Sequence, residues 1–299
     1  MRVVYSRLAS DTSPKSPDYW QYFGARLADL AEIPRGATVL DVGTGPGSVF
    51  LPAAEQAGET GFTVGIDIDW DWFRFVRPGI RERGLGNTAL LHMDAAHLGF
   101  ADGSFDRVLC GNLAWDYCFD FFRMEFTGPD VRLAEIWRLL KGGGRVGISS
   151  WVAREDIDWF GAQFIDYFPE YVAEWEEAQG EAFRVYHESV GGYDRILRAG
   201  GFQDVQVSTE TEEFVSTDEE EWWGQVWGAY WWEYIDPVAD RDPDKLAEFK
   251  ASIFRGLQQF KQRDGIHAQK TAVMALGTKP SQRGTRSRSG TQCKGNRDD

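Results

Sequence analysis

The sequence predicts an α/β fold in which a doubly wound parallel sheet carries helices on its faces. Between residues 38 and 149, short apolar segments alternate with helical patterns of about 10–15 residues, which is typical of strand–helix–strand units. The first apolar segment runs directly into a glycine-rich turn and then into a helix start. Sheets of this kind bind ligands at the carboxyl ends of their strands, so functional residues are expected there.

Hydrophobic periodicity, glycine and proline mark the bounds of the expected elements. Strands are expected at residues 38–42, 62–66, 89–92, 105–110, 145–149, 202–208 and 271–277. Helices are expected at 18–33, 48–57, 72–84, 131–140, 193–199, about 217–234 and 244–263, and the segment 151–188 is mostly helical by pattern. The end of the chain is rich in Ser, Arg, Gly and Gln, which predicts a disordered tail.

Composition and charge exclude several classes of function. The 299 residues carry a net charge of −15, and such an acidic body repels nucleic-acid phosphates, so no nucleic-acid partner is expected. No apolar run approaches the roughly 18 residues of a membrane span. The three cysteines offer no metal-ligand spacing, and with no apolar leader they indicate a cytoplasmic protein. The expected assembly is a monomer or a homodimer.

The segment 39–50 contains an acid and three glycines at alternate positions between a strand and a helix. A nucleotide-binding P-loop would require a lysine after the last glycine, and Ser48 follows Gly47 instead. In the dinucleotide fingerprint G-x-G-x-x-G, the third glycine would lie one residue later than Gly47. A tight turn without any ligand is the remaining alternative.

Two further acids follow strand ends. Asp67 ends the second strand, where its carboxylate can accept both hydroxyls of a ribose lying over the glycine loop. Asp94 follows the third strand, where it can accept from the amino group of an adenine. For both residues, a purely structural role at a helix cap or strand end is the alternative.

The segment from Asp41 to Gly47 matches the D/E-x-G-x-G-x-G loop of class I methyltransferases that use S-adenosylmethionine (SAM). Together with Phe100-Ala101-Asp102-Gly103-Ser104-Phe105-Asp106 and Leu139-Leu140-Lys141-Gly142-Gly143-Gly144-Arg145, it resembles the ubiquinone/menaquinone-biosynthesis-like branch (methyltransferase type 11/25) over roughly residues 38–150. Gly99 and Gly142 replace prolines of that branch at positions that touch no ligand. The resemblance implies a Rossmann-like sheet of seven strands, mostly parallel with the last antiparallel, plus helical lid insertions.

The resemblance also implies a domain organisation and a cofactor site. An N-terminal segment and cap helix would occupy residues 1–36, the methyltransferase domain 37–279 with lid insertions at about 152–190 and 210–267, and the tail 280–299. The cofactor would be S-adenosyl-L-methionine. Its methionine part would lie on the glycine loop and near Asn112, its ribose on Asp67, and its adenine between Ile68 and the Asp94 turn. The residues expected to bind it are Asp41, Gly43, Thr44, Gly45, Gly47, Asp67, Ile68, Asp94, Ala95 and Asn112.

Methyl transfer from a sulfonium requires mainly that the acceptor be positioned, and a base helps only when the acceptor must lose a proton. The related family often has two histidines at the positions of Trp115 and Asp116, which leaves Asp116 as a candidate base. His187, in the half expected to form the lid, is a second catalytic candidate, with an ordinary surface histidine as the alternative. Asn112 and Trp115 are also spaced like the ends of the Asn-Pro-Pro-Tyr motif of amino-group methyltransferases, without its prolines.

Aromatic residues crowd the expected lid. Trp223, Trp227, Tyr230, Trp231 and Tyr234 fall on one face of the helix expected at 217–234. Packing on the sheet or a dimer contact are alternatives to an apolar substrate pocket. The candidate substrate-binding residues are Tyr22, Trp115, Trp151, Trp223 and Trp227.

These observations predict a SAM-dependent methyltransferase that acts on a hydrophobic or aromatic small molecule, at oxygen, nitrogen or carbon. The alternative is a protein of the same fold that binds SAM or its product S-adenosylhomocysteine (SAH) but does not transfer the methyl group. A nicotinamide dehydrogenase is a third option, and it would bind NAD rather than SAM.

Overall fold

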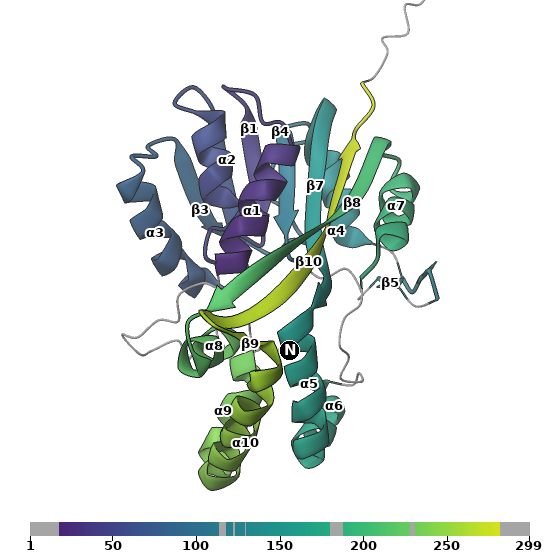
Figure 1. Cartoon of the computed structure of the whole chain (residues 1–299). Helices are drawn as coiled ribbons and strands as arrows, with labels where there is room; N and C mark the ends of the chain where they lie inside the picture. The colour runs from purple at the N-terminus through teal and green to yellow at the C-terminus, as the bar shows by residue number, and fades with distance from the viewer. Residues whose placement is uncertain are drawn as a thin grey trace, which may run out of the picture.

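The computed structural model of the protein describes residues 18–113, 118–121, 123–128, 130–179, 188–227 and 231–281. Its centre is a sheet in the order β3-β2-β1-β4-β7-β10-β8, with β9 paired to β10 (Figure 1). The strands are β1 (Thr38–Val42), β2 (Phe62–Asp67), β3 (Thr88–His92), β4 (Phe105–Gly111), β7 (Leu140–Arg154), β8 (Gln203–Ser216), β9 (Lys261–Gln262) and β10 (Gly265–Thr278).

Strand direction in the sheet follows the predicted pattern. Strand β1 is parallel to β2 and β4, and β4 is parallel to β7. Strand β10, the last in the chain, is antiparallel to both of its neighbours, β7 and β8. The predicted doubly wound sheet with an antiparallel last strand is therefore confirmed. The two-residue strand β9 and the hairpin of β5 (Phe119–Asp120) and β6 (Glu125–Phe126) were not predicted, because so short a strand has no alternation to read.

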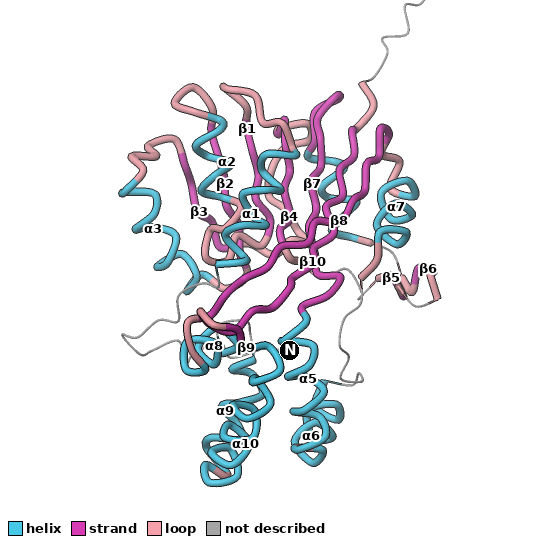
Figure 2. The backbone as a smooth tube through the Cα atoms, viewed as in Figure 1, coloured by secondary structure: helices cyan, strands magenta, loops and turns pink. Residues whose placement is uncertain are grey.

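Helices cover the sheet and form a separate group beyond one end of it. They are α1 (Asp18–Leu30), α2 (Phe50–Ala57), α3 (Phe73–Glu82), α4 (Val131–Leu139), α5 (Glu155–Tyr167), α6 (Pro169–Gln179), α7 (Val190–Ala199), α8 (Glu219–Val226), α9 (Trp232–Arg241) and α10 (Pro243–Gly256). Figure 2 shows α1 in front of the sheet, and α5, α6, α8, α9 and α10 gathered below it. We call these five helices the lid.

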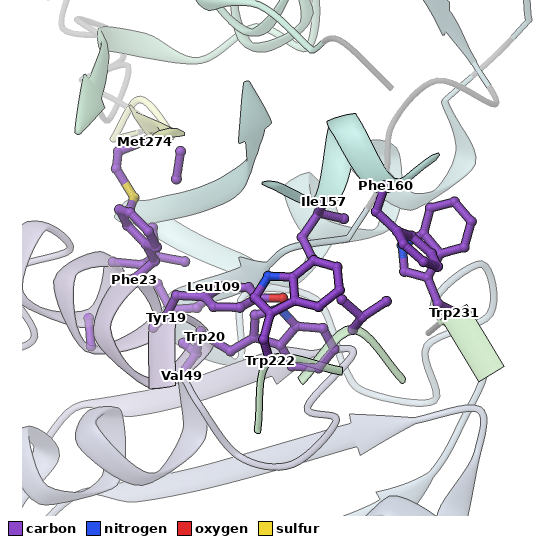
Figure 3. Packing of buried hydrophobic residues seen from close by; sticks show 14 of the residues in the cluster. Tyr19, Trp20, Phe23, Val49, Leu109, Ile157, Phe160, Trp222, Trp231 and Met274 are labelled. Carbon is purple, nitrogen blue, oxygen red and sulfur yellow. The ribbon is translucent and has the colours of Figure 1, made fainter. Parts of the chain in front are cut away.

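Alternate residues of the central strands enter two hydrophobic cores. Val39 and Leu109 belong to the core that contains side chains of α1, α2 and the lid. Leu40 and Val108, each one residue away, belong to the core formed with α4 and α7. This alternation is expected of strands that are buried on both faces. The aromatic side chains of the first core come from α1 (Tyr19, Trp20, Phe23) and from the lid (Phe160, Trp222, Trp231), as Figure 3 shows.

The strands that carry the lid are longer than the periodicity predicted. Strand β8 runs to Ser216 and β10 begins at Gly265, so both extend into the segment 210–267 that the sequence assigned to a lid insertion. They pair with each other along most of their length, from Ile266 opposite Ser216 to Thr278 opposite Gln203. The exposed side of these two strands is polar. The part of β8 beyond residue 208 therefore lacks the alternation of apolar residues by which a strand is predicted.

The tryptophan-rich segment does not form the single helix predicted for 217–234. Asp218 caps α8 near the predicted start, but α8 ends at Val226 and α9 begins at Trp232. Trp222, rather than Trp223, is the tryptophan buried to 1% exposure. The structure therefore divides the predicted helix into α8 and α9. The aromatic residues predicted to share one face still meet one core: Trp231 belongs to it, and Trp223, Trp227 and Tyr234 pack against it, whereas Tyr230 lies outside the described residues.

A buried ion pair joins the lid to the sheet. Lys270 of β10 pairs with Asp156 of α5, and their exposures are 2% and 3%. The indole of Trp222 donates to Oδ2 of Asp156 at 2.7 Å, and the backbone N–H of Ile157 donates to Oδ1 at 2.9 Å. The lysine ammonium also lies 5.2 Å from the centre of the Tyr19 ring. Because each of these groups is buried, removing one would leave its partner without compensation.

Candidate functional site

A cavity of about 530 Å³ lies at the carboxyl ends of the parallel strands. Its walls come from the loops after β1, β2, β3 and β4, from β7 and α5, and from α1 and the lid. Nine of the residues predicted from the sequence line it: Gly43, Thr44, Gly45, Asp67, Ile68, Asp94, Ala95, Asn112 and Trp151. The fold therefore brings together, in one place, side chains that are separated by more than a hundred positions in the chain.

The glycine loop after β1 is tied to the end of β2. The backbone N–H groups of Gly43 and Thr44 both donate to the carbonyl of Ile66, at 2.9 Å each. Gly45 donates to Oδ2 of Asp67 at 2.8 Å. The φ angle of Gly45 is +48°, in the left-handed region that favours glycine, so the loop turns there and presents bare backbone to the cavity.

Asp41, directly before this loop, is a buried acid with an exposure of 1%. Among the described residues, neither of its carboxylate oxygens has a hydrogen-bond partner. Burial raises the pKa of Asp41 to about 7; the nearby Thr44 side chain offsets part of this rise, and the negative charge of Asp67 adds to it. A buried acid without a partner favours a nearby cation, because a cation would offset the cost of ionisation.

The next acids along this wall are also perturbed by burial. Asp67 accepts from Gly45 and, through Oδ1, from the backbone N–H of Asp69 at 2.9 Å, and burial raises its pKa. Asp69 lines the cavity with an exposure of 8%, and burial raises its pKa as well. Each carboxylate oxygen of Asp67 can accept a further hydrogen bond besides the one from the backbone, so the two oxygens can still accept two hydroxyl groups. Asp69 was missed because its position two residues after the strand end matches no expected motif.

Apolar and polar residues follow at the ends of β2 and β3. Ile68 is 62% exposed although it is aliphatic, and it lines the cavity with Met93 and Ala95. Asp94 accepts from the backbone N–H of Ala96 at 2.8 Å and remains exposed. The other oxygen of Asp94 lies 3.5 Å from Nδ1 of His97. An exposed aliphatic side chain beside an exposed carboxylate suits a flat heteroaromatic ring that carries an amino group.

Asn112 lies where β4 ends and has a φ angle of +55°, which is uncommon for a residue other than glycine. Its backbone N–H donates to the carbonyl of Ser149 at 2.8 Å, which holds it against β7. Within the described part of the chain, its side-chain oxygen Oδ1 is buried without a hydrogen-bond partner. A ligand donor in the cavity would satisfy this oxygen.

Aromatic side chains and a few charged ones also line the cavity. Trp20 of α1, Trp151 of β7, and Trp231 and Tyr234 of the lid all line it. Glu188 lines it too, and this buried acid accepts a short hydrogen bond from the hydroxyl of Tyr193. Aromatic walls with few polar groups are typical of sites for hydrophobic small molecules.

Several predicted residues do not line the cavity. Gly47 packs near Val76 and Leu51, where an added Cβ would lie 3.2 and 3.4 Å from their side chains, so its role is in loop and helix packing. Tyr22 is 37% exposed, and its hydroxyl lies 3.3 Å from Glu212. Its neighbour Trp20 lines the cavity instead, because the two side chains leave α1 in different directions.

The tryptophans predicted from the lid also lie elsewhere. Trp223 packs against Phe160 and Phe254, and the indole of Trp227 donates to Asp236 at 3.0 Å. Trp115, Asp116 and His187 lie outside the described residues, so their assigned roles stay predictions. His92, within the predicted third strand, is exposed, and its Nε2 lies 2.7 Å from the carbonyl oxygen of Ile68.

Comparison with known proteins identifies the family. The family model of the methyltransferase domain matches residues 33–230. The chain belongs to this methyltransferase family. It is 30% identical over 266 residues to nocamycin O-methyltransferase from Saccharothrix syringae, a match that covers 85% of this chain and 90% of that enzyme. Demethylmenaquinone methyltransferase from Listeria welshimeri is 31% identical over 144 residues, covering 48% of this chain and 55% of that enzyme.

A solved structure shows the same fold. The YcgJ protein from Bacillus subtilis has a TM-score of 0.53 and 18% identity, and the match covers 87% of this chain and 99% of that protein. The resemblance to ubiquinone/menaquinone-like class I methyltransferases, read from the motifs, is confirmed. The protein is a SAM-dependent methyltransferase, and its cofactor is SAM. In the described part of this methyltransferase, no helix has the length and apolarity to traverse a bilayer.

The cavity fits this cofactor on physical grounds. SAM carries a positive sulfonium and a positive ammonium. Asp67 lines the cavity, whereas Asp41, directly before the glycine loop, is buried without lining it. The cavity is also lined by two neighbouring acids, Asp67 and Asp69, and by the exposed Ile68. Together these residues suit a ribose and an adenine. These residues therefore provide acceptors and negative charge where a cationic nucleoside would need them.

Proposed function

We propose that this methyltransferase methylates a hydrophobic or aromatic small molecule that binds between the glycine loop and the lid. The observation that carries the proposal is that one cavity is lined both by the acids after β2, which we call its acidic wall, and by a set of aromatic side chains, which we call its aromatic wall. Trp20, Trp151, Trp231 and Tyr234 form the aromatic wall, and none of them is adjacent in sequence to a cofactor residue. The similarity to nocamycin O-methyltransferase, which acts at oxygen, supports an acceptor of the metabolite class.

We assign the cofactor-binding roles residue by residue. Asp67 would accept both ribose hydroxyls, and Ile68 and Ala95 would pack against the adenine, whose amino group would donate to Asp94. Asp41 and Asn112 would hold the methionine end against the backbone of the glycine loop. When bound, SAM supplies an activated methyl group on its sulfonium.

The chain's own contribution is to hold the acceptor and to exclude water. The lid and α1 close over the cavity with aromatic side chains, such as Trp231 with an exposure of 8%. Apolar contact of this kind orients a flat acceptor without requiring a specific hydrogen bond. An acceptor that must lose a proton would also need a base, and Asp116 and His187 remain the candidates from the sequence.

We also expect a cytoplasmic monomer or homodimer. Light scattering with size-exclusion chromatography would report the assembly directly. A fractionated extract of the native cells would report the location.

The proposal is tested by turnover with a panel of flat aromatic acceptors. The protein is incubated with SAM, and SAH formation is measured by mass spectrometry together with the gain of one methyl group by the acceptor. We expect SAH and methylated product in equal amounts. The variant Tyr234→Ala should raise KM for the acceptor and leave the SAM affinity unchanged, whereas the surface control Phe62→Ala should change neither. SAM binding without any product across the panel would favour the non-methylating alternative.

A further inference from the structure

Arg154 is a charged side chain in the aromatic half of the cavity. It is the last residue of β7 and the residue before α5, and its side chain is 17% exposed. Its guanidinium carbon lies 5.7 Å from the centre of the Trp151 ring. Among the described lining residues, Arg132 and Arg154 are the basic ones, and Arg154 lies beside the aromatic side chains that would hold an acceptor.

The guanidinium of Arg154 is incompletely paired. Within the described residues, its Nε is buried without a hydrogen-bond partner. The nearest acid is Asp158, whose Oδ1 lies 3.9 Å from that Nε, which is too long for a hydrogen bond. The other oxygen of Asp158 accepts from the backbone N–H of Arg154 at 2.7 Å, so this acid caps the helix rather than holding the guanidinium.

The next acid along α5 is also occupied. Both oxygens of Asp156 take part in the buried network with Lys270, Trp222 and Ile157. Burial lowers the pKa of Lys270, and the positive charge of Arg154 lowers it further, so these two bases lie close to each other. Asp156 and Asp158 thus make their hydrogen bonds to other groups, which leaves the Nε of Arg154 without a hydrogen-bond acceptor among the described residues.

We propose that Arg154 recognises a carboxylate on the methyl acceptor. A guanidinium presents its N–H donors in a planar fork that matches the two oxygens of a carboxylate, and such pairs form the stronger hydrogen bonds. The aromatic ring system of the acceptor would lie against Trp151 and Trp231, which line the same half of the cavity. Arg154 then determines acceptor specificity, selecting acids over neutral compounds of the same shape. This inference rests on the proposed function.

The test compares binding of 2-naphthoate and its neutral isostere 2-naphthamide to the protein saturated with SAH. Isothermal titration calorimetry at pH 7.5 measures both affinities, since naphthoate is ionised there. We expect the wild-type chain to bind naphthoate at least 10-fold more tightly than naphthamide. In Arg154→Gln, naphthoate affinity should fall roughly 10- to 100-fold, the range for lost hydrogen bonds to a charged group, while naphthamide affinity changes less than threefold.

Two controls separate recognition from folding. Arg195→Gln removes an exposed arginine on α7 that does not line the cavity, and it should keep the naphthoate preference. Arg154→Lys keeps the charge without the fork and should bind naphthoate with intermediate affinity. SAH affinity should be the same in all four proteins, which shows that the cavity is intact.

The outcomes distinguish this inference from the function on which it rests. If the wild-type chain fails to bind SAH, the proposed function is overturned and the inference falls with it. If the wild-type chain binds SAH but binds naphthoate no more tightly than naphthamide, or not at all, only the inference is overturned. An unchanged naphthoate preference in Arg154→Gln overturns it equally.

Discussion

The backbone N–H of Gly45 donates to Oδ2 of Asp67 at 2.8 Å, and this bond links the loop after β1 to the acid that ends β2. In the proposed assignment, the two residues belong to different halves of the cofactor site: the loop would take the methionine end, and the acid would take the ribose. One carboxylate therefore fixes the spacing between the two halves. Asp67 is expected to act on cofactor affinity both directly and through the shape of the loop.

Asp67→Ala should weaken SAH binding by about 1–3 kcal/mol, because hydrogen bonds from the ribose hydroxyls to a charged acceptor are lost. Asp67→Asn keeps an oxygen acceptor and should lose less. Calorimetry measures both affinities, with the exposed Asp166→Ala of α5 as the matched control. If Asp67→Ala lowered the melting temperature and left SAH affinity unchanged, a purely structural role for this acid would be established instead.

Gly45 can be tested by two substitutions that separate strain from charge. An added Cβ at Gly45 has space, since its nearest atom would be the Gly43 carbonyl oxygen at 3.9 Å. Gly45→Ala should therefore cost about 1 kcal/mol of stability, from the positive φ angle alone, and should keep SAH binding. Gly45→Asp adds a negative charge and bulk where the methionine carboxylate would lie and should abolish SAH binding. Equal SAH affinities in the two variants would count against the loop assignment.

The raised pKa of Asp41 makes the cofactor-free protein less stable as the pH increases. In the folded chain this group keeps its proton up to about pH 7, whereas in the unfolded chain it ionises near 3.8. Between these values the folded state binds more protons, so the free energy of unfolding falls as the pH rises through that window. Thermal unfolding of Asp41→Asn at a series of pH values should show a flatter dependence than the wild type.

The same group should make SAH binding pH-dependent. The positive ammonium of the ligand favours ionised Asp41, so binding releases a proton and SAH affinity should rise as the pH increases from 5.5 to 8. Calorimetry in two buffers of different ionisation enthalpy measures the proton release. A pH-independent SAH affinity in the wild type, equal to that of Asp41→Asn, would exclude this role for Asp41.

The buried pair of Asp156 and Lys270 should behave as a unit. Asp156→Ala leaves the lysine buried without its partner and should lower the free energy of unfolding by about 3–5 kcal/mol. The double variant Asp156→Leu with Lys270→Met replaces both charges by apolar groups and should be less destabilised than either single change. Urea unfolding measures all of these. Additive losses in the double variant would show that the two side chains contribute independently.

Local sequence was sufficient to predict that Gly43, Gly45 and Asp67 line one cavity. Asp41, the glycines and Asp67 lie at strand ends, where the topology of a parallel sheet determines which side chains meet. Trp20 was missed in favour of Tyr22, because both lie on α1 and periodicity alone does not show which faces a cavity. Gly47 was assigned to the ligand, although its neighbours in the structure are Val76 and Leu51.

The acceptor wall depends on contacts that no local pattern contains. Arg154 ends a strand that runs past its predicted limit at residue 149, so it was read as part of a lid insertion. Trp222 is buried in the core, where its indole N–H donates to Asp156, 66 positions earlier in the chain. Such long-range pairing is decided by the packing of the lid on the sheet, which the spacing of aromatic residues within one helix does not specify.

A crystal structure of the protein with SAH tests the central claim most directly. We expect the ribose hydroxyls within hydrogen-bond distance of Asp67, the adenine beside Ile68 and Ala95, and the methionine part over Gly43 and Gly45. SAH bound elsewhere, or NAD bound in this cavity in preference to SAH, would contradict the account.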